Sequence, residues 1–145
     1  MKRLGVFVAA GVLFAAAPSF AQTVGTCPRG GGGNQPPPAR VLFDLGSAQI
    51  RADNKPVIAQ AAATAKARQV SVICLIGHTD KLGDKAFNEK LSRSRAQAVA
   101  AQMIRDGVPA NHLYIVADPE AFGNMGLGKE DASVIDRKVT IFFSR

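Results

Sequence analysis

Two residues in the middle of the chain, Asp80 and Arg95, carry a carboxylate and a guanidinium. Asp80 ends the sequence 77–80, Gly-His-Thr-Asp, which directly follows an apolar run at 70–76. Arg95 lies in an alanine-rich stretch that begins near Lys85. A carboxylate accepts hydrogen bonds from an ammonium, and a guanidinium binds a carboxylate in a fork geometry. The pair is therefore suited to a small zwitterion, such as an amino acid, which carries both groups on one carbon.

The segments around this pair predict how it is positioned. The run 70–76 is short and rich in β-branched residues, which indicates a strand buried on both faces. Asp84 is a suitable N-cap for a helix that begins at Lys85. We expect this helix to end near Asp106, because Gly107 follows as a C-terminal stop.

One stripe of the predicted helix carries polar side chains. At about 100° per residue, four side chains fall within a narrow stripe that we expect to lie beside Asp80: Asn88, Ser92, Arg95 and Val99. Four others are expected to face the core: Phe87, Leu91, Ala98 and Ile104. Free amides at the start of the helix would add a secondary site for an anion.

The remaining segments complete a regular alternation of strands and helices. The expected elements are a strand at 41–43, a helix at 52–68 capped by Asp53, a strand at 70–76, a helix at 85–106, a strand at 113–116 and a last strand at 138–143. Strands separated by helices favour right-handed crossovers with the helices packed on the sheet. We therefore predict an α+β fold, a βαβαβ-β mixed sheet, in one domain at 41–145.

The first forty residues differ in composition from this domain. Residues 1–21 combine a basic start, an apolar run and small residues at Ser19 and Ala21, which predicts a signal peptide cleaved after Ala21. The alternative is a retained anchor. Residues 22–40 are rich in glycine and proline without apolar periodicity, so we expect a linker.

Charge limits the classes of partner. The formal net charge is +7, and removal of residues 1–21 leaves 16 Lys and Arg against 11 Asp and Glu. This balance favours an acidic polymer or an anionic envelope surface. An exported chain does not meet nucleic acid, and no basic patch interleaved with aromatic residues appears, so nucleic acid is excluded as a partner. Contact with a membrane is expected only if the chain is anchored.

The two cysteines allow three interpretations. A disulfide between Cys27 and Cys74 is permitted in an oxidising compartment. Alternatively, Cys74 is a small hydrophobe in the middle of a strand. Cys27 is also a candidate for a lipid anchor, although Thr26 before it matches the lipidation motif poorly.

Several spaced motifs resemble the OmpA-like domain family, which includes OmpA, MotB and Pal. They span about Val41 to Phe143 and comprise GHTD at 77–80, Gly83, Asn88, LSRSRA at 91–96 and DRKV at 136–139. The resemblance implies non-covalent binding of peptidoglycan through the diaminopimelate of the stem peptide, without catalysis or a cofactor. It assigns the ligand's amine to Asp80 and its carboxylate to Arg95, with Asn88 and Arg137 lining the same pocket. It also implies a periplasmic protein associated with the cell wall or the outer membrane.

Two segments depart from the family pattern. The sequence 118–123 matches poorly the glycine-rich turn that usually follows the third strand, and Asp136 stands before Arg137 where asparagine is usual. The chief alternative function follows from these departures. It is an envelope protein-interaction module of the same fold, with a drifted pocket, that docks its partner through the loop at 117–134.

The same stretch of sequence also allows a turn cap, a hydrolase site or a metal site. Taken alone, Asp80 could cap a turn. A hydrolase would need His78 as base and Ser92 or Ser94 as nucleophile, but both serines are expected inside a helix rather than on an exposed elbow. A metal site from His78, Asp80 and His112 matches no ligand spacing. We therefore predict neither an enzyme nor a metal site.

Overall fold

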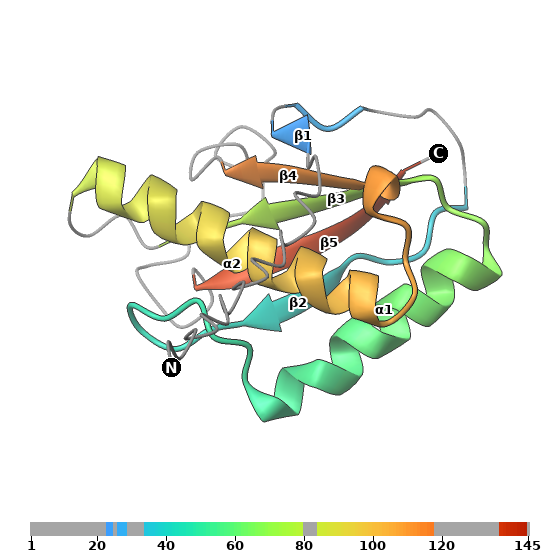
Figure 1. Ribbon diagram of the computed structural model, residues 1–145, viewed down its shortest axis with the longest axis horizontal. Helices are drawn as coiled ribbons and strands as arrows, with labels where there is room; N and C mark the ends of the chain where they lie inside the picture. Colours follow the sequence, from blue (N-terminus) through green and yellow to red (C-terminus); the bar gives the residue numbers. More distant parts are fainter. Residues whose placement is uncertain (1–22, 25, 29–33, 80–83, 118–136, 145) are drawn as a thin grey trace, which may run out of the picture.

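One mixed sheet with two helices on the same face forms the domain (Figure 1). This computed structural model describes residues 23–24, 26–28, 34–79, 84–117 and 137–144, so the predicted signal peptide at 1–21 lies outside the described residues. The strand order is β1-β4-β3-β5-β2. The strands are β1 (Thr23–Val24), β2 (Ala39–Leu42), β3 (Val72–Gly77), β4 (Leu113–Ala117) and β5 (Lys138–Ser144). The predicted α+β fold is confirmed.

The pairing of the strands explains why the sheet is mixed. Strand β3 lies in the centre, parallel to β4 on one side and antiparallel to β5 on the other. The last strand, β5, is inserted between β3 and β2 and is antiparallel to both. The carboxyl ends of β3 and β4 therefore meet the start of β5 at one end of the sheet, where Gly77 is opposite both Ala117 and Val139.

The helices begin and end close to where the sequence predicts. They are α1 (Lys55–Ala67), preceded by the 3-10 turn η1 (Ala52–Asn54), and α2 (Lys85–Arg105), followed by the 3-10 turn η2 (Ala110–His112). Asp84 caps α2 as predicted, since its Oδ1 accepts a hydrogen bond of 3.1 Å from Ala86 N. Gly107, at φ 93°, ends α2, and Val108 N donates back to Met103 O at 3.0 Å.

The predicted cap of the first helix is wrong. Asn54 occupies the N-cap position of α1 and makes no capping hydrogen bond with its side chain. The carboxylate of Asp53 instead accepts from the guanidinium of Arg51, at 3.1 and 2.9 Å. The buried Asn54 amide pairs with the backbone N–H and C=O of Leu42, at 3.2 and 3.3 Å. It therefore satisfies polar groups of β2, the last strand in the sheet order.

The hydrophobic core fills the space between the helices and one face of the sheet. Alternate strand residues point into it, such as Ile73 and Leu75 of β3 and Ile141 and Phe143 of β5. Small residues of both helices cover them, among them Ala61, Ala62, Ala65, Ala96 and Ala100. Because these side chains are small, the helices lie close to the sheet.

The predicted orientation of α2 is wrong. The stripe of Asn88, Ser92, Arg95 and Val99, which we expected to lie beside Asp80 while other residues faced the core, is the buried stripe. Phe87, expected in the core, is 57% exposed. The physical reason is the close approach of α2 to the sheet, which admits small side chains such as Ser92 and leaves large ones outside.

Part of the predicted linker belongs to the sheet. Thr23–Val24 forms β1 and pairs in parallel with Tyr114 and Ile115 of β4, and β2 begins at Ala39. Backbone pairing needs no apolar periodicity, which is why composition missed it. The segment is low in hydrophobic residues and, as expected, the described core cluster begins only after it, at Val41.

A disulfide joins Cys27 to Cys74, with the two Cα atoms 5.8 Å apart. Lipidation of the Cys27 thiol is therefore incompatible with this structure, because its sulfur is already bonded. The two cysteines are 47 residues apart in sequence. Closing a loop of this length lowers the entropy of the unfolded chain by an amount worth at most about 4 kcal/mol. Since small domains have unfolding free energies of about 5–15 kcal/mol, the fold need not depend on this bond.

Among the described residues, neither α1 nor α2 has the length and apolar character to cross a membrane.

Candidate ligand-binding site at the carboxyl end of β3

The site predicted from sequence is located where β3 leads toward α2. The two elements meet at Gly77, the last residue of β3, and Gly77 is buried. A Cβ atom on Gly77 would overlap the backbone carbonyl of Ser92 in α2, with the carbonyl carbon only 2.7 Å away. Glycine is therefore required at this position by contact with a neighbouring backbone. The contact fixes α2 against the end of β3, one turn before Arg95.

Arg95 is buried at this junction. Its side chain points from α2 to three backbone carbonyls: Nε donates to Ser47 O at 2.8 Å, Nη1 to His78 O at 3.2 Å and Nη2 to Asp44 O at 3.1 Å. The residue is 1% exposed. These charge-assisted hydrogen bonds compensate for burying the guanidinium. Arg95 thus connects α2 to the segment after β3 and to the loop after β2.

Phe43 links the two arginines of the predicted site. Its ring lies 5.4 Å from the guanidinium carbon of Arg95, a cation–π contact. Its backbone N–H donates to Arg137 O at 2.8 Å. Lys138, the next residue, accepts from His78 N at 2.8 Å through its carbonyl. The structure therefore brings Arg95 and Arg137 to the same end of the sheet.

Of the remaining predicted site residues, Asn88 is described by the structure and Asp80 is not. Asn88 lies on the same buried face of α2 as Arg95 and is 9% exposed. Asp80 lies outside the described residues, as do Asp136 and nearly all of the loop at 117–134. His78 is half-buried, and its Nε2 is 3.4 Å from Thr140 Oγ1. This contact connects His78 to β5.

Two buried polar atoms at this end have no hydrogen-bond partner among the described residues. They are Thr79 Oγ1, immediately after His78, and Arg137 Nε. Buried polar groups in folded proteins are nearly always satisfied by protein, water or ligand. These two atoms therefore identify a part of the site where water or a bound molecule is expected.

The start of α2 is not the open anion site that the sequence suggests. The carboxylate of Asp84 already accepts from Ala86 N. A carboxylate at a helix N-terminus both satisfies an amide and offsets the positive end of the helix dipole. A second anion would have to compete with it, so the expected secondary site is corrected to a self-capped helix start.

The comparison with family models decides the classification. The model of the OmpA family matches residues 42–137, about two thirds of the chain. The chain belongs to the OmpA family. The match includes the described site residues Arg95, Asn88 and Arg137 and ends directly before β5, which begins at Lys138.

Relatives and solved structures agree with the OmpA classification. Outer membrane protein A of Bordetella avium is 32% identical over 76 residues, which are 52% of this chain and 39% of that protein. The peptidoglycan-associated lipoprotein of Brucella melitensis is 31% identical over 78 residues, 54% of this chain and 46% of that one. The matched stretch is thus less than half the length of either relative.

A crystal structure shows the same fold. The peptidoglycan-associated lipoprotein from Burkholderia pseudomallei superposes with a TM-score of 0.61 at 25% identity, covering 73% of this chain and 90% of that one. The arrangement of sheet and helices seen here is therefore that of an OmpA-like domain.

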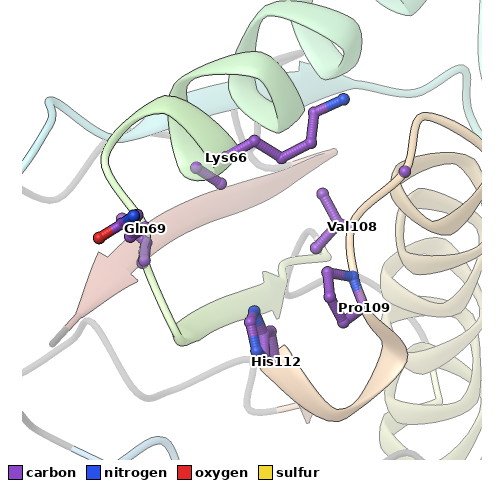
Figure 2. A pocket seen from close by; sticks show the side chains of 8 residues that line it. Lys66, Gln69, Val108, Pro109 and His112 are labelled. Atoms are coloured by element: carbon purple, nitrogen blue, oxygen red, sulfur yellow. The ribbon is translucent and has the colours of Figure 1, made fainter.

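A surface hollow lies at the opposite end of this OmpA-like domain, beside the carboxyl ends of both helices (Figure 2). It has a volume of about 340 Å³ and is lined by Ala65, Lys66, Gln69, Val70, Gly107, Val108, Pro109 and His112. Lys66 donates to Asp106 O at 2.8 Å, next to the end of α2. Because helix carboxyl ends carry partial negative charge, this lysine has a structural role in satisfying them.

The described residues that were weighed for metal binding and for catalysis are placed as follows. Within 34–79, 84–117 and the other described segments, no three His, Cys, Asp or Glu side chains are grouped so that they could hold a metal ion. Ser92 is fully buried and Ser94 donates to Lys90 O at 2.9 Å. Neither serine is presented as an exposed nucleophile.

Reasoning from the sequence did not identify the loop after β2 as part of the site. Asp44 and Ser47 contribute only backbone carbonyls, which carry no residue-type signal. The signal that could have found them is Arg95 itself. A guanidinium on the same helical stripe as Val99 must be buried, and a buried guanidinium needs several acceptors.

Proposed function

We propose that this domain binds peptidoglycan non-covalently in the cell envelope, through the diaminopimelate of the stem peptide. In this proposal Asp80 accepts the ligand's ammonium, and Arg95 contributes to binding its carboxylate. Asn88 and Arg137 are supporting donors. The chain acts as a binding protein in the periplasm, associated with the cell wall or the outer membrane, and catalyses no reaction.

The observation that carries the proposal is the position of the Arg95 guanidinium. It is one hydrogen bond, of 3.2 Å, from the backbone carbonyl of His78, in the segment that leads to Asp80. Membership of the OmpA family and the names of its peptidoglycan-associated relatives support the same function. The two unsatisfied polar atoms, at Thr79 and Arg137, support a bound molecule at this end of the sheet.

The burial of Arg95 refines the role proposed for it. Three hydrogen bonds to backbone carbonyls and the contact with Phe43 fix the guanidinium before any ligand arrives. A fixed cation costs no side-chain entropy when a carboxylate binds. We therefore propose that Arg95 acts as a pre-organised charge at the base of the site, while Asp80 accepts the ligand's ammonium.

Sedimentation with insoluble peptidoglycan tests this proposal. Replacing Asp80 with asparagine keeps the side-chain shape but removes the charge that would meet an ammonium. A hydrogen bond between charged groups contributes about 1.5–3 kcal/mol, so affinity is expected to fall at least about tenfold. The readout is the fraction of protein that sediments with purified sacculi at several protein concentrations.

Asp84→Asn is the matched control. It removes the same charge close by in sequence and keeps a good N-cap for α2. Wild type and Asp84→Asn should sediment equally. Equal sedimentation of the Asp80→Asn protein would overturn the assignment of Asp80, and failure of the wild type to sediment would overturn the proposed function.

A further inference from the structure

The disulfide joins a residue that precedes the part of the chain covered by the OmpA family model to a residue inside it. Cys27 precedes the match at 42–137, and Cys74 is inside it. Cys74 is in the middle of β3 and is 0% exposed, yet it is not part of the core cluster that contains its neighbours Ile73 and Leu75. Because side chains alternate along a strand, its sulfur points to the sheet face away from the helices.

The two sulfurs differ in accessibility. Cys27 is half-buried, between exposed neighbours at Thr26 and Pro28, whereas Cys74 is completely buried. In thiol–disulfide exchange, the attacking thiolate must reach one sulfur of the bond in line with the other. Cys27 Sγ is the sulfur that an external thiol can reach, with Cys74 Sγ as the leaving group.

Little else in the described structure holds this segment to the domain. Strand β1 contributes only two residue pairs with β4, at Tyr114 and Ile115. Among the residues whose burial the structure describes, the buried core cluster contains none before Val41. An isolated pairing of this length is too short to persist by itself. The disulfide is therefore the principal connection, and the core is complete without it.

We propose that the Cys27–Cys74 bond is a site of reversible thiol–disulfide exchange, and that its reduction releases β1 from the edge of β4. The reaction partner is a dithiol. Its thiolate attacks Cys27 Sγ, the S–S bond breaks, and Cys74 leaves and takes a proton. The second thiol of the partner then displaces Cys27 from the mixed disulfide, so the dithiol becomes oxidised and both cysteines become thiols.

Release of β1 changes the surface of the domain without unfolding it. The β1-facing backbone groups of β4 lose their partners and become an exposed sheet edge, which can accept another strand. The helices, β2, β3 and β5 keep their packing, because the core cluster of the described residues begins at Val41. This inference does not depend on peptidoglycan binding, and its test needs no peptidoglycan.

Native-state reduction followed by hydrogen exchange tests the inference. The purified protein is treated with dithiothreitol without denaturant, free thiols are trapped with N-ethylmaleimide, and amide exchange is measured across β4 and β5. Both cysteines should be labelled. Exchange at the β1-facing amides of β4 should accelerate at least tenfold, while that of β5 and the circular dichroism spectrum stay unchanged. A separate incubation of the disulfide-bonded protein with reduced glutathione should place the first adduct on Cys27, with Cys74 released as the free thiol.

A Cys27→Ser variant provides the second arm. It keeps Cys74 in place and removes the bond, so its β4 exchange should match that of the reduced wild type and should not respond to dithiothreitol. Resistance of the disulfide to reduction unless denaturant is added would overturn the inference. So would loss of the fold on reduction, or unchanged exchange at β4 in the Cys27→Ser protein.

Discussion

Replacing Arg95 with alanine is expected to lower the free energy of unfolding by about 3–5 kcal/mol. The substitution leaves the carbonyls of Asp44, Ser47 and His78 without the donors they have in the native structure. It also removes the cation over the ring of Phe43 and opens a cavity under a residue that is 1% exposed. Urea denaturation followed by circular dichroism measures the change.

Arg93→Ala is the matched control for this prediction. Arg93 is on the same helix, but its side chain is 41% exposed and forms a surface ion pair of 3.3 Å with Glu89. Its loss should cost less than about 1 kcal/mol. If Arg95→Ala proved as stable as Arg93→Ala and lost only ligand binding, the structural role assigned to Arg95 would be wrong.

This expectation changes how binding data on Arg95 should be interpreted. The family resemblance assigns Arg95 to the ligand, and the structure gives it a second task in holding the site together. Loss of binding in an alanine variant would therefore mix two effects. Asp80→Asn, which removes a charge and keeps the shape of the side chain, gives the cleaner test of ligand contact.

Gly77→Ala is expected to destabilise the domain by about 3 kcal/mol. The new Cβ would overlap the Ser92 carbonyl, and a backbone group inside a helix cannot move aside as a flexible side chain can. Helix α2 would have to shift away from β3, which would also strain the hydrogen bonds of Arg95. Amide exchange in α2 and the midpoint of urea denaturation should both report the change.

Gly46→Ala separates steric overlap from backbone conformation. Gly46 has φ of 66° and open space around the position of a Cβ, so alanine there costs only the left-handed conformation, about 1–2 kcal/mol. Exchange in α2 should stay at the wild-type level in this variant. Unchanged stability and unchanged α2 exchange in Gly77→Ala would contradict the close approach of α2 to β3.

The fold was predictable from sequence because its signals are local. The β-branched run at 70–76, the cap at Asp84 and the stop at Gly107 locate β3 and α2 within about two residues. The pairing of β1 was not predictable, since two residues of backbone pairing leave no pattern. The disulfide was left open, because sequence does not give the distance between Cys27 and Cys74.

The sequence names candidate residues for the site but does not predict how they pack. Motif positions suggest Asn88, Arg95 and Arg137, whose roles stay predictions, and the structure brings Arg95 and Arg137 to one end of the sheet through Phe43. Hydrophobic periodicity put the large side chains of α2 in the core, yet Phe87 is exposed and Ser92 is buried. The distance between α2 and the sheet decides which side chains are buried. That distance is set by Gly77, which belongs to β3 and not to α2.

The most direct test of the central claim compares two stem peptides that differ only in carrying diaminopimelate or lysine. Lysine has the side-chain amine but lacks the second carboxylate, so it cannot satisfy both proposed contacts. Isothermal titration of the wild-type protein should give at least about tenfold tighter binding of the diaminopimelate peptide. Equal affinity for the two peptides, or no binding of either, would contradict recognition of a zwitterion at this site.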